Sequence, residues 1–303
     1  MQRAEIVDII QRAGQALTEQ YVYPDVGEQL GKLLAERLAS GRYDHVGSPE
    51  TLGALVTEDL QSINGDLHLR LKHHEIEIPE AAESPTEGEI TRLVESTMGG
   101  VARVQHHPGN IGHLELAPYL LPPELAGTAV TAALQLIAPT RALLLDLRGT
   151  LGGTPEMVAL ICGYLFDEPV HLNTFYARAG EQSRQSWSAA YVPGPRFGGH
   201  KPVYVLTSGA TFSAGEELTY DLQQQKRATV VGERTRGGAH PRIGLRLHPH
   251  LELTVPVARP VNPVSGTNWE GCGVSPDIEV LADEAFNTAY QAALSALDQR
   301  PSI

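Results

Sequence analysis

From Val101 onward, short apolar runs alternate with amphipathic helical patterns, and this alternation restricts the possible fold more than any other feature of the chain. Runs with the length of strands lie at 101–105, 111–116, 143–147, 170–176, 203–206, 227–231, 243–247 and 251–257. Helical patterns lie at 122–137, 154–165 and 283–297, and another begins close to 213. Strands that alternate with helices form a largely parallel sheet covered by helices, so the sequence predicts an α/β domain.

The first 63 residues have a different pattern, with amphipathic helices expected at 3–19, 25–39 and 48–63. Ser48-Pro49 begins the last of them with a cap residue and a proline at the first helical position. A turn at 64–66 then leads into a strand at 68–72, and the Pro- and Glu-rich segment 78–88 is expected to be an exposed loop. We therefore predict a helical subdomain over 1–66 and an α/β core domain over 67–303.

Charge and composition exclude several classes of partner. The net charge of −13 opposes binding to nucleic acid or to an anionic membrane. No run approaches a membrane span, and Glu5 and Asp8 interrupt the apolar start that a signal peptide would need. Cys162 and Cys272 provide no disulfide framework, and neither a metal nor a cofactor is expected. These features favour a cytoplasmic protein.

Ser213 is the first candidate for chemistry. The buried strand at 203–206 is followed by small residues and then by a helix, so we expect Ser213 in the first turn of that helix. Small neighbours leave its hydroxyl accessible, and the unpaired N–H groups of a helix start favour a developing oxyanion. Ser213 is thus a candidate nucleophile, and the alternative is that it only caps the helix.

The loop after the strand at 143–147 is the second candidate. It also connects a buried strand to a helix, and it contains Gly152-Gly153. A glycine pair lets the backbone approach a ligand and direct N–H groups toward an anion. No Gly-Lys-Ser/Thr follows, so the loop is not a P-loop, and a plain tight turn is the alternative.

Four motifs together resemble one known family. In order, they are DLRGTLGGTPEM, TSGATFSAGEE, VVGERTRGGAHP and NWEGCGVSPDIEV. They resemble the tail-specific or C-terminal processing serine peptidase family, and most of all the branch that includes interphotoreceptor retinoid-binding protein. TEQYVYPD and LTEDLQSINGDLHLRL are similar to the helical leader of that branch. The resemblance implies a ββα-spiral core of the crotonase and Clp-protease type, preceded by a small N-terminal helical bundle.

The resemblance also implies roles for individual residues. Ser213 matches the nucleophile, and Gly152 or Gly153 together with the N–H of Ala214 match the oxyanion hole. The lysine base of the motif T-x-G-K-G is absent, because Gly238 stands at its position.

Members of the tricorn type are similar in lacking this lysine, and they use a histidine with a glutamate. Those positions match His68 and Glu270 in this sequence. His240 is a second candidate base, but it precedes Pro241 and lies two positions beyond the missing lysine. We therefore favour His68.

The resemblance leads us to expect a serine-type peptidase that acts through an acyl-enzyme on a peptide or protein substrate. A histidine has the unperturbed pKa, ~6.5, that a base for a serine hydroxyl requires, and Glu270 would orient it. The alternatives are a serine esterase and a non-catalytic module that binds apolar small molecules such as retinoids or fatty acids. A pure carrier would not need the serine, histidine and glutamate together. The oligomeric state is not determined by the sequence.

Overall fold

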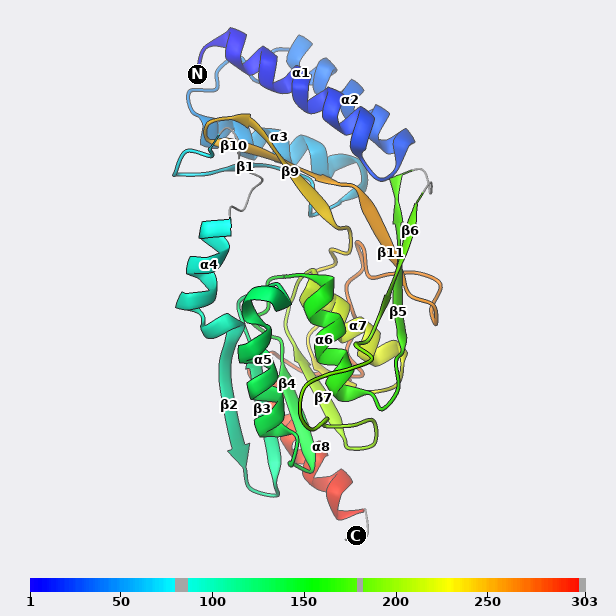
Figure 1. The fold of residues 1–303 in the computed structure, drawn as a ribbon. Helices are drawn as coiled ribbons and strands as arrows, with labels where there is room; N and C mark the ends of the chain where they lie inside the picture. Colours follow the sequence, from blue (N-terminus) through cyan, green and yellow to red (C-terminus); the bar gives the residue numbers. More distant parts are fainter. Residues whose placement is uncertain (80–86, 179–181, 300–303) are drawn as a thin grey trace. The chain divides into compact units, whose positions relative to one another are not determined.

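A computed structural model describes residues 1–79, 87–178 and 182–299 and divides the chain into two compact units (Figure 1). Unit 1 comprises Met1–Thr86, Phe175–Arg184 and His240–Pro260. Unit 2 comprises Glu87–Thr174, Gln185–Ala239 and Val261–Ile303. The boundary that the sequence predicts after residue 66 falls inside unit 1, because later strands pack beneath the N-terminal helices.

Unit 1 begins with the expected helices, α1 (Arg3–Gln20), α2 (Pro24–Ala39) and α3 (Pro49–Asn64). The ends of α3 follow from its sequence. The Ser48 hydroxyl accepts a hydrogen bond from the Thr51 N–H, and Pro49 occupies the first helical position. Gly65 ends the helix in the left-handed conformation with φ of 70°, which glycine adopts without steric cost.

The sheet of unit 1 has the strand order β1-β10-β9 and is antiparallel. Its strands are β1 (Arg70–His73), β9 (Arg242–His248) and β10 (Leu251–Pro256). Leu71, Leu253 and Val255 are buried in the same core as the apolar faces of α1, α2 and α3. This shared core explains why β9 and β10, which the sequence assigns to the core domain, belong to unit 1.

The sheet of unit 2 has the order β12-β8-β7-β4-β3-β2. Its strands are β2 (Val101–His107), β3 (Ile111–Leu116), β4 (Ala142–Asp146), β7 (Val203–Thr207), β8 (Thr229–Gly232) and β12 (Ile278–Glu279). Neighbouring strands are parallel except for β2, which pairs antiparallel with β3. The sheet is therefore mixed, and all but one of its strand pairs have the predicted direction.

Helices cover both faces of this sheet (Figure 1). α5 (Pro123–Ile137), α6 (Pro155–Leu165) and α7 (Ala214–Gln224) share a core with Leu143 and Leu145 of β4. α8 (Ala285–Asp298) packs on the opposite face, where Leu144 points. Successive residues of β4 are buried on opposite faces of the sheet, so both faces of this strand are covered. The predicted α/β class is confirmed. None of the helices in the described part of the chain combines the length and apolar character needed to cross a bilayer.

Several elements are absent from the prediction. They are α4 (Glu87–Ser96), a 3₁₀ turn at Met98–Gly100, β6 (Ser183–Trp187), β11 (Ala258–Val261) and β12. β6 and β11 flank the predicted strand β5 (His171–Ala177) in a third sheet of order β11-β5-β6. The segment SRQSW of β6 is polar and lacks the apolar run that marks a buried strand. Most of the loop expected at 78–88 lies outside the described residues.

Candidate active site

Ser213 lies between β7 and α7, in a strained backbone conformation. The sequence predicts it in the first turn of the helix, and the structure places it one residue earlier, at the N-cap. Its φ of 53° and ψ of −119° differ from the extended conformation typical of an N-cap residue. Such a conformation in a non-glycine residue costs about 1–3 kcal/mol and persists only where the surroundings enforce it. An ordinary cap would not need this geometry.

The turn before Ser213 is bonded to the loop that contains the glycine pair. Three hydrogen bonds join the two segments. They run from Ser208 Oγ to Arg148 O (2.7 Å), from Thr211 Oγ1 to Leu147 O (2.9 Å) and from Phe212 N to Thr150 O (2.9 Å). The two loops therefore form one rigid assembly at the carboxyl ends of β4 and β7.

Within this assembly, Gly152 lies directly against Ser213. A Cβ atom built on Gly152 would be 3.4 Å from Ser213 Cβ and 3.8 Å from Ser213 Oγ. Gly152 and Gly153 have φ of 145° and 146°, a region that favours glycine. Gly153 instead meets the backbone of Leu120, with its added Cβ 2.1 Å from Leu120 O.

Three backbone N–H groups near the serine remain available for a ligand. Within the described residues, the N–H groups of Gly152, Gly153 and Ala214 donate to no protein acceptor. N–H groups close to a serine hydroxyl are the donors that stabilise the oxyanion of an acyl-transfer reaction. The structure thus places Gly152 directly against Ser213 and Ala214 next to it in the chain, whereas Gly153 packs against Leu120.

Glu216 braces this arrangement. Its buried carboxylate accepts hydrogen bonds from Ser213 N (2.9 Å), Thr235 Oγ1 (2.6 Å), Gly237 N (2.6 Å) and Gly238 N (2.9 Å). Burial raises the pKa of Glu216, and these hydrogen bonds lower it in part. Glu216 therefore joins the backbone of the serine to the loop where the family motif would carry its lysine.

Glu270 lies on a loop of unit 2 that is hydrogen-bonded to residues 238–239, next to the segment that Glu216 contacts. Glu270 Oε2 accepts a hydrogen bond from Ala239 N, and Trp269 Nε1 donates to Gly238 O at 2.8 Å. The Trp269 side chain is fully buried and fixes the loop. The carboxylate of Glu270 is thus held by the backbone at one oxygen.

In unit 1, Asp66 organises both candidate histidines. Asp66 Oδ1 accepts a hydrogen bond from His68 N (2.9 Å), and Asp66 Oδ2 contacts His240 Nδ1 (2.9 Å) and accepts from Tyr21 Oη (2.8 Å). His68, His240 and Asp66 are all buried. The structure therefore places His68 and His240 in unit 1, around one carboxylate.

Burial affects the pKa values of His68 and Asp66. It lowers the pKa of His68 to about 4, although the negative charge of Asp66 acts in the opposite direction. Burial acts to raise the pKa of Asp66, but the hydrogen bonds from His240 and Tyr21 outweigh this effect and the pKa is lowered. His68 is therefore neutral at physiological pH, as a general base must be.

A second polar group, on the α8 face of the sheet in unit 2, resembles a metal site by residue type. The ligand atoms of His113, Glu115 and Asp146 lie within 4.8 Å of one another. Asp146 is already paired with Arg148 (2.6 Å), and Glu115 is paired with Arg103 (3.2 Å). Guanidinium groups at these carboxylates oppose a further cation, so the group acts as an ion-pair network.

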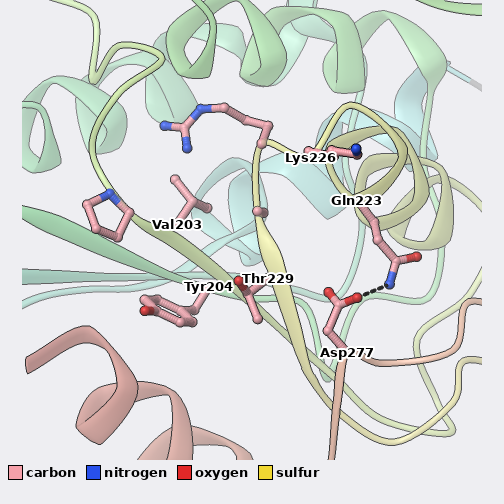
Figure 2. A pocket seen from close by; sticks show the side chains of 9 residues that line it. Val203, Tyr204, Gln223, Lys226, Thr229 and Asp277 are labelled. Atoms are coloured by element: carbon pink, nitrogen blue, oxygen red, sulfur yellow. Dashed lines mark hydrogen bonds between the residues drawn. The ribbon is translucent and has the colours of Figure 1, made fainter. Parts of the chain in front are cut away.

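A pocket of about 320 Å³ lies at the opposite end of β7 from Ser213 (Figure 2). The start of β7 and the end of α7 line it, together with Asp277. Asp277 accepts hydrogen bonds from Gln223 Nε2 (3.1 Å) and Val230 N (2.7 Å). Gln223 and Asp277 thus bond to each other across the pocket, which lies apart from the candidate nucleophile.

Comparison with known families decides the classification. The family model "Peptidase family S41" matches residues 110–280, which is more than half of the chain. The chain belongs to peptidase family S41. A second model, the N-terminal domain of peptidase S41 in eukaryotic IRBP, matches residues 2–100. The resemblance that the motifs predict is confirmed, including its similarity to the retinoid-binding-protein branch.

Individual relatives support the family and the fold. The carboxy-terminal-processing protease of Bartonella bacilliformis is 35% identical over 80 residues, which cover 26% of this chain and 18% of that protein. The photosystem II D1 C-terminal processing protease has a TM-score of 0.53 at 15% identity, with 97% of each chain covered. The tricorn protease has a TM-score of 0.63 at 12% identity, with 98% of this chain and 37% of that protein covered. At such identities the two structures show a common fold.

Glu216 and Asp66 of this S41 chain have roles that none of the family motifs assigns. Glu216 stands three positions after Ser213, which is the spacing of a capping box, and this signal predicts its bond to Ser213 N. Its bonds to the 235–238 loop and the contact between Asp66 and His240 join residues far apart in the sequence. No local pattern predicts such pairs.

Proposed function

We propose that this S41 chain is a serine peptidase that acts through an acyl-enzyme. Ser213 is the nucleophile, His68 the general base, and Glu270 the carboxylate that orients His68. The N–H groups of Gly152 or Gly153 and of Ala214 form the oxyanion hole. The observation that carries the proposal is the strained backbone of Ser213 directly against Gly152.

The proposed chemistry has two half-reactions. Ser213 Oγ attacks the carbonyl carbon of the scissile bond while the imidazole of His68 accepts the hydroxyl proton. The carbonyl oxygen becomes an oxyanion, and backbone N–H groups stabilise it. His68 then protonates the leaving amine, and a water molecule, deprotonated by the same imidazole, hydrolyses the ester. Burial keeps the His68 ring neutral before the attack, but its pKa of about 4 also makes it a weaker proton acceptor than a histidine with the unperturbed pKa of ~6.5.

The substrate class follows from the relatives. The Bartonella protein is named a carboxy-terminal-processing protease, so we propose a peptide or protein substrate for this chain too. His240 is the alternative base, because its Nδ1 contacts Asp66 Oδ2 and the ring is thereby oriented. A serine esterase would use the same residues. A carrier of retinoids or fatty acids would use none of them.

Labelling with a fluorophosphonate probe tests the proposal. We expect covalent labelling of the wild type at Ser213 and none in Ser213→Ala, which should remain folded because the lost hydroxyl is worth at most about 1–2 kcal/mol. Ser295→Ala, a change on α8 far along the chain from the site, is the control and should label like the wild type. An unlabelled wild type, or a folded Ser213→Ala variant that still hydrolyses peptides, would refute the peptidase proposal. A fluorescence titration with retinol would then test the carrier alternative.

A further inference from the structure

Helix α7, which begins just after Ser213, buries an acid that the proposed chemistry does not use. Asp221 is completely buried, two turns along α7 from the serine. In the described part of the chain no Arg or Lys forms an ion pair with it. Two asparagine amides contact it instead, Asn173 Nδ2 at 3.0 Å from each carboxyl oxygen and Asn262 Nδ2 at 3.1 Å from Oδ1. A buried acid without a cation is costly, so its retention requires an explanation.

Asn262 connects Asp221 to the loop that carries Glu270. Its Oδ1 accepts hydrogen bonds from Val264 N (2.9 Å) and Ser265 N (3.3 Å), and its Nδ2 also donates to Leu172 O (3.0 Å). The Asn262 side chain therefore stabilises the turn at the start of this loop by accepting hydrogen bonds from two of its backbone N–H groups. Asp221 fixes the orientation of that side chain.

A second contact joins the same two elements. Tyr220, the neighbour of Asp221 on α7, donates from Oη to Ser265 Oγ at 2.8 Å. Its ring lies 5.4 Å from that of Trp269, centroid to centroid. Trp269 immediately precedes Glu270, so both ends of the 262–270 loop contact α7.

We propose that Asp221 is a positioning residue, which through Asn262 holds the 262–270 loop, and with it Glu270, in register with the helix that begins after Ser213. The inference rests on the proposed function, because it assigns the loop a purpose in catalysis. The loop is otherwise long and mostly exposed, and the orientation of a catalytic carboxylate requires rigid support.

The charge state of Asp221 is compatible with this role. Burial raises the pKa of Asp221 to about 8, and the two asparagine amides lower it only in part. Asn173 and Asn262 contact it directly, and the charge of an ionised Asp221 acts in turn to raise the pKa of the buried Cys162 thiol. With its pKa raised to about 8, Asp221 is mostly protonated at neutral pH, and its O–H then donates to Asn173 Oδ1, which has no other hydrogen-bond partner within the described residues, once the Asn173 amide is turned over. Asparagine at this position mimics that neutral form.

The test compares Asp221→Asn with Asp221→Leu, which has similar volume but no polar atom. The same change at the exposed Asp298 on α8, Asp298→Leu, is the matched control. The first measurement is hydrogen exchange of the Val264 and Ser265 amides, and the second is kcat and KM for a peptide. We expect Asp221→Leu to exchange at least tenfold faster at both amides and to lose kcat by at least tenfold with little change in KM. Asp221→Asn and Asp298→Leu should behave like the wild type.

Two results would overturn the inference. One is wild-type exchange and wild-type kcat in folded Asp221→Leu, and the other is equal impairment of the Asn and Leu variants. If Asp221→Leu does not fold, Asn262→Ala tests the same link from the loop side with the same expectations. Hydrogen exchange needs no catalysis, so an inactive wild type would contradict the proposed function, while the exchange result would still decide whether Asp221 holds the loop.

Discussion

The glycine pair allows a sharp test, because its two members face different neighbours. Alanine at Gly152 would place a methyl group 3.4 Å from Ser213 Cβ and 3.8 Å from Ser213 Oγ, which is ordinary van der Waals contact. Its main stability cost is the φ of 145°, roughly 1–3 kcal/mol. Alanine at Gly153 would place its Cβ 2.1 Å from Leu120 O, a backbone atom that cannot rotate away. The first change therefore acts on the nucleophile, and the second acts on the fold.

We expect Gly152→Ala to remain folded and to label with a fluorophosphonate about 10²- to 10³-fold more slowly, which is the loss typical of a disturbed oxyanion donor. Gly153→Ala should lose more stability than Gly152→Ala. Thermal unfolding and the labelling rate, measured on both variants, check the two expectations. A folded Gly152→Ala variant with the wild-type labelling rate would refute the oxyanion assignment. Equal stability of Gly153→Ala and the wild type would refute the account of its contact with Leu120.

Three further predictions concern titratable side chains. His68→Ala should lower kcat by several orders of magnitude, Glu270→Gln by less, and His240→Ala only slightly, and the reverse order of the histidines would reassign the base. Because His68 has a pKa of about 4, kcat/KM should hold its neutral-pH value down to about pH 5 and fall near pH 4, whereas a fall near ~6.5 would contradict this burial effect. Asp221 has a folded pKa of about 8, above the ~3.9 of an unfolded aspartate, so its contribution to stability is complete below pH ~4 and is lost as the pH rises toward 8. Asp221→Asn should remove this loss, which amounts to at most about 1.4 kcal/mol per pH unit, and urea unfolding of both proteins at pH 5 and pH 8 measures it.

The parts of the site that depend on local sequence could be predicted. A buried strand, a run of small residues and a helix mark the position of Ser213, and the glycine pair marks its neighbouring loop. Helix α7 begins at Ala214, so Ser213 is its N-cap rather than a residue of its first turn. Helix starts with unusual backbone conformations are difficult to place from periodicity alone.

The parts that depend on tertiary packing could not be predicted. The alternation in β9 and β10 identifies strands, but it does not identify β1 as their partner or the N-terminal helices as their cover. Three of the four donors on Glu216, from Thr235, Gly237 and Gly238, and the pairing of Asp66 with His240 come from distant segments in the same way. Residue types indicate which groups can bond, and only the fold selects the pairs.

The proposed function requires that Ser213 becomes acylated during turnover, and trapping the acyl-enzyme detects this step. The protein is mixed with an activated ester substrate, quenched in acid within the first turnover, and analysed by intact mass and peptide mapping. We expect a mass increase equal to one acyl group, located on Ser213 and absent in Ser213→Ala. Substrate hydrolysis with no adduct, or an adduct at any other residue, would contradict it.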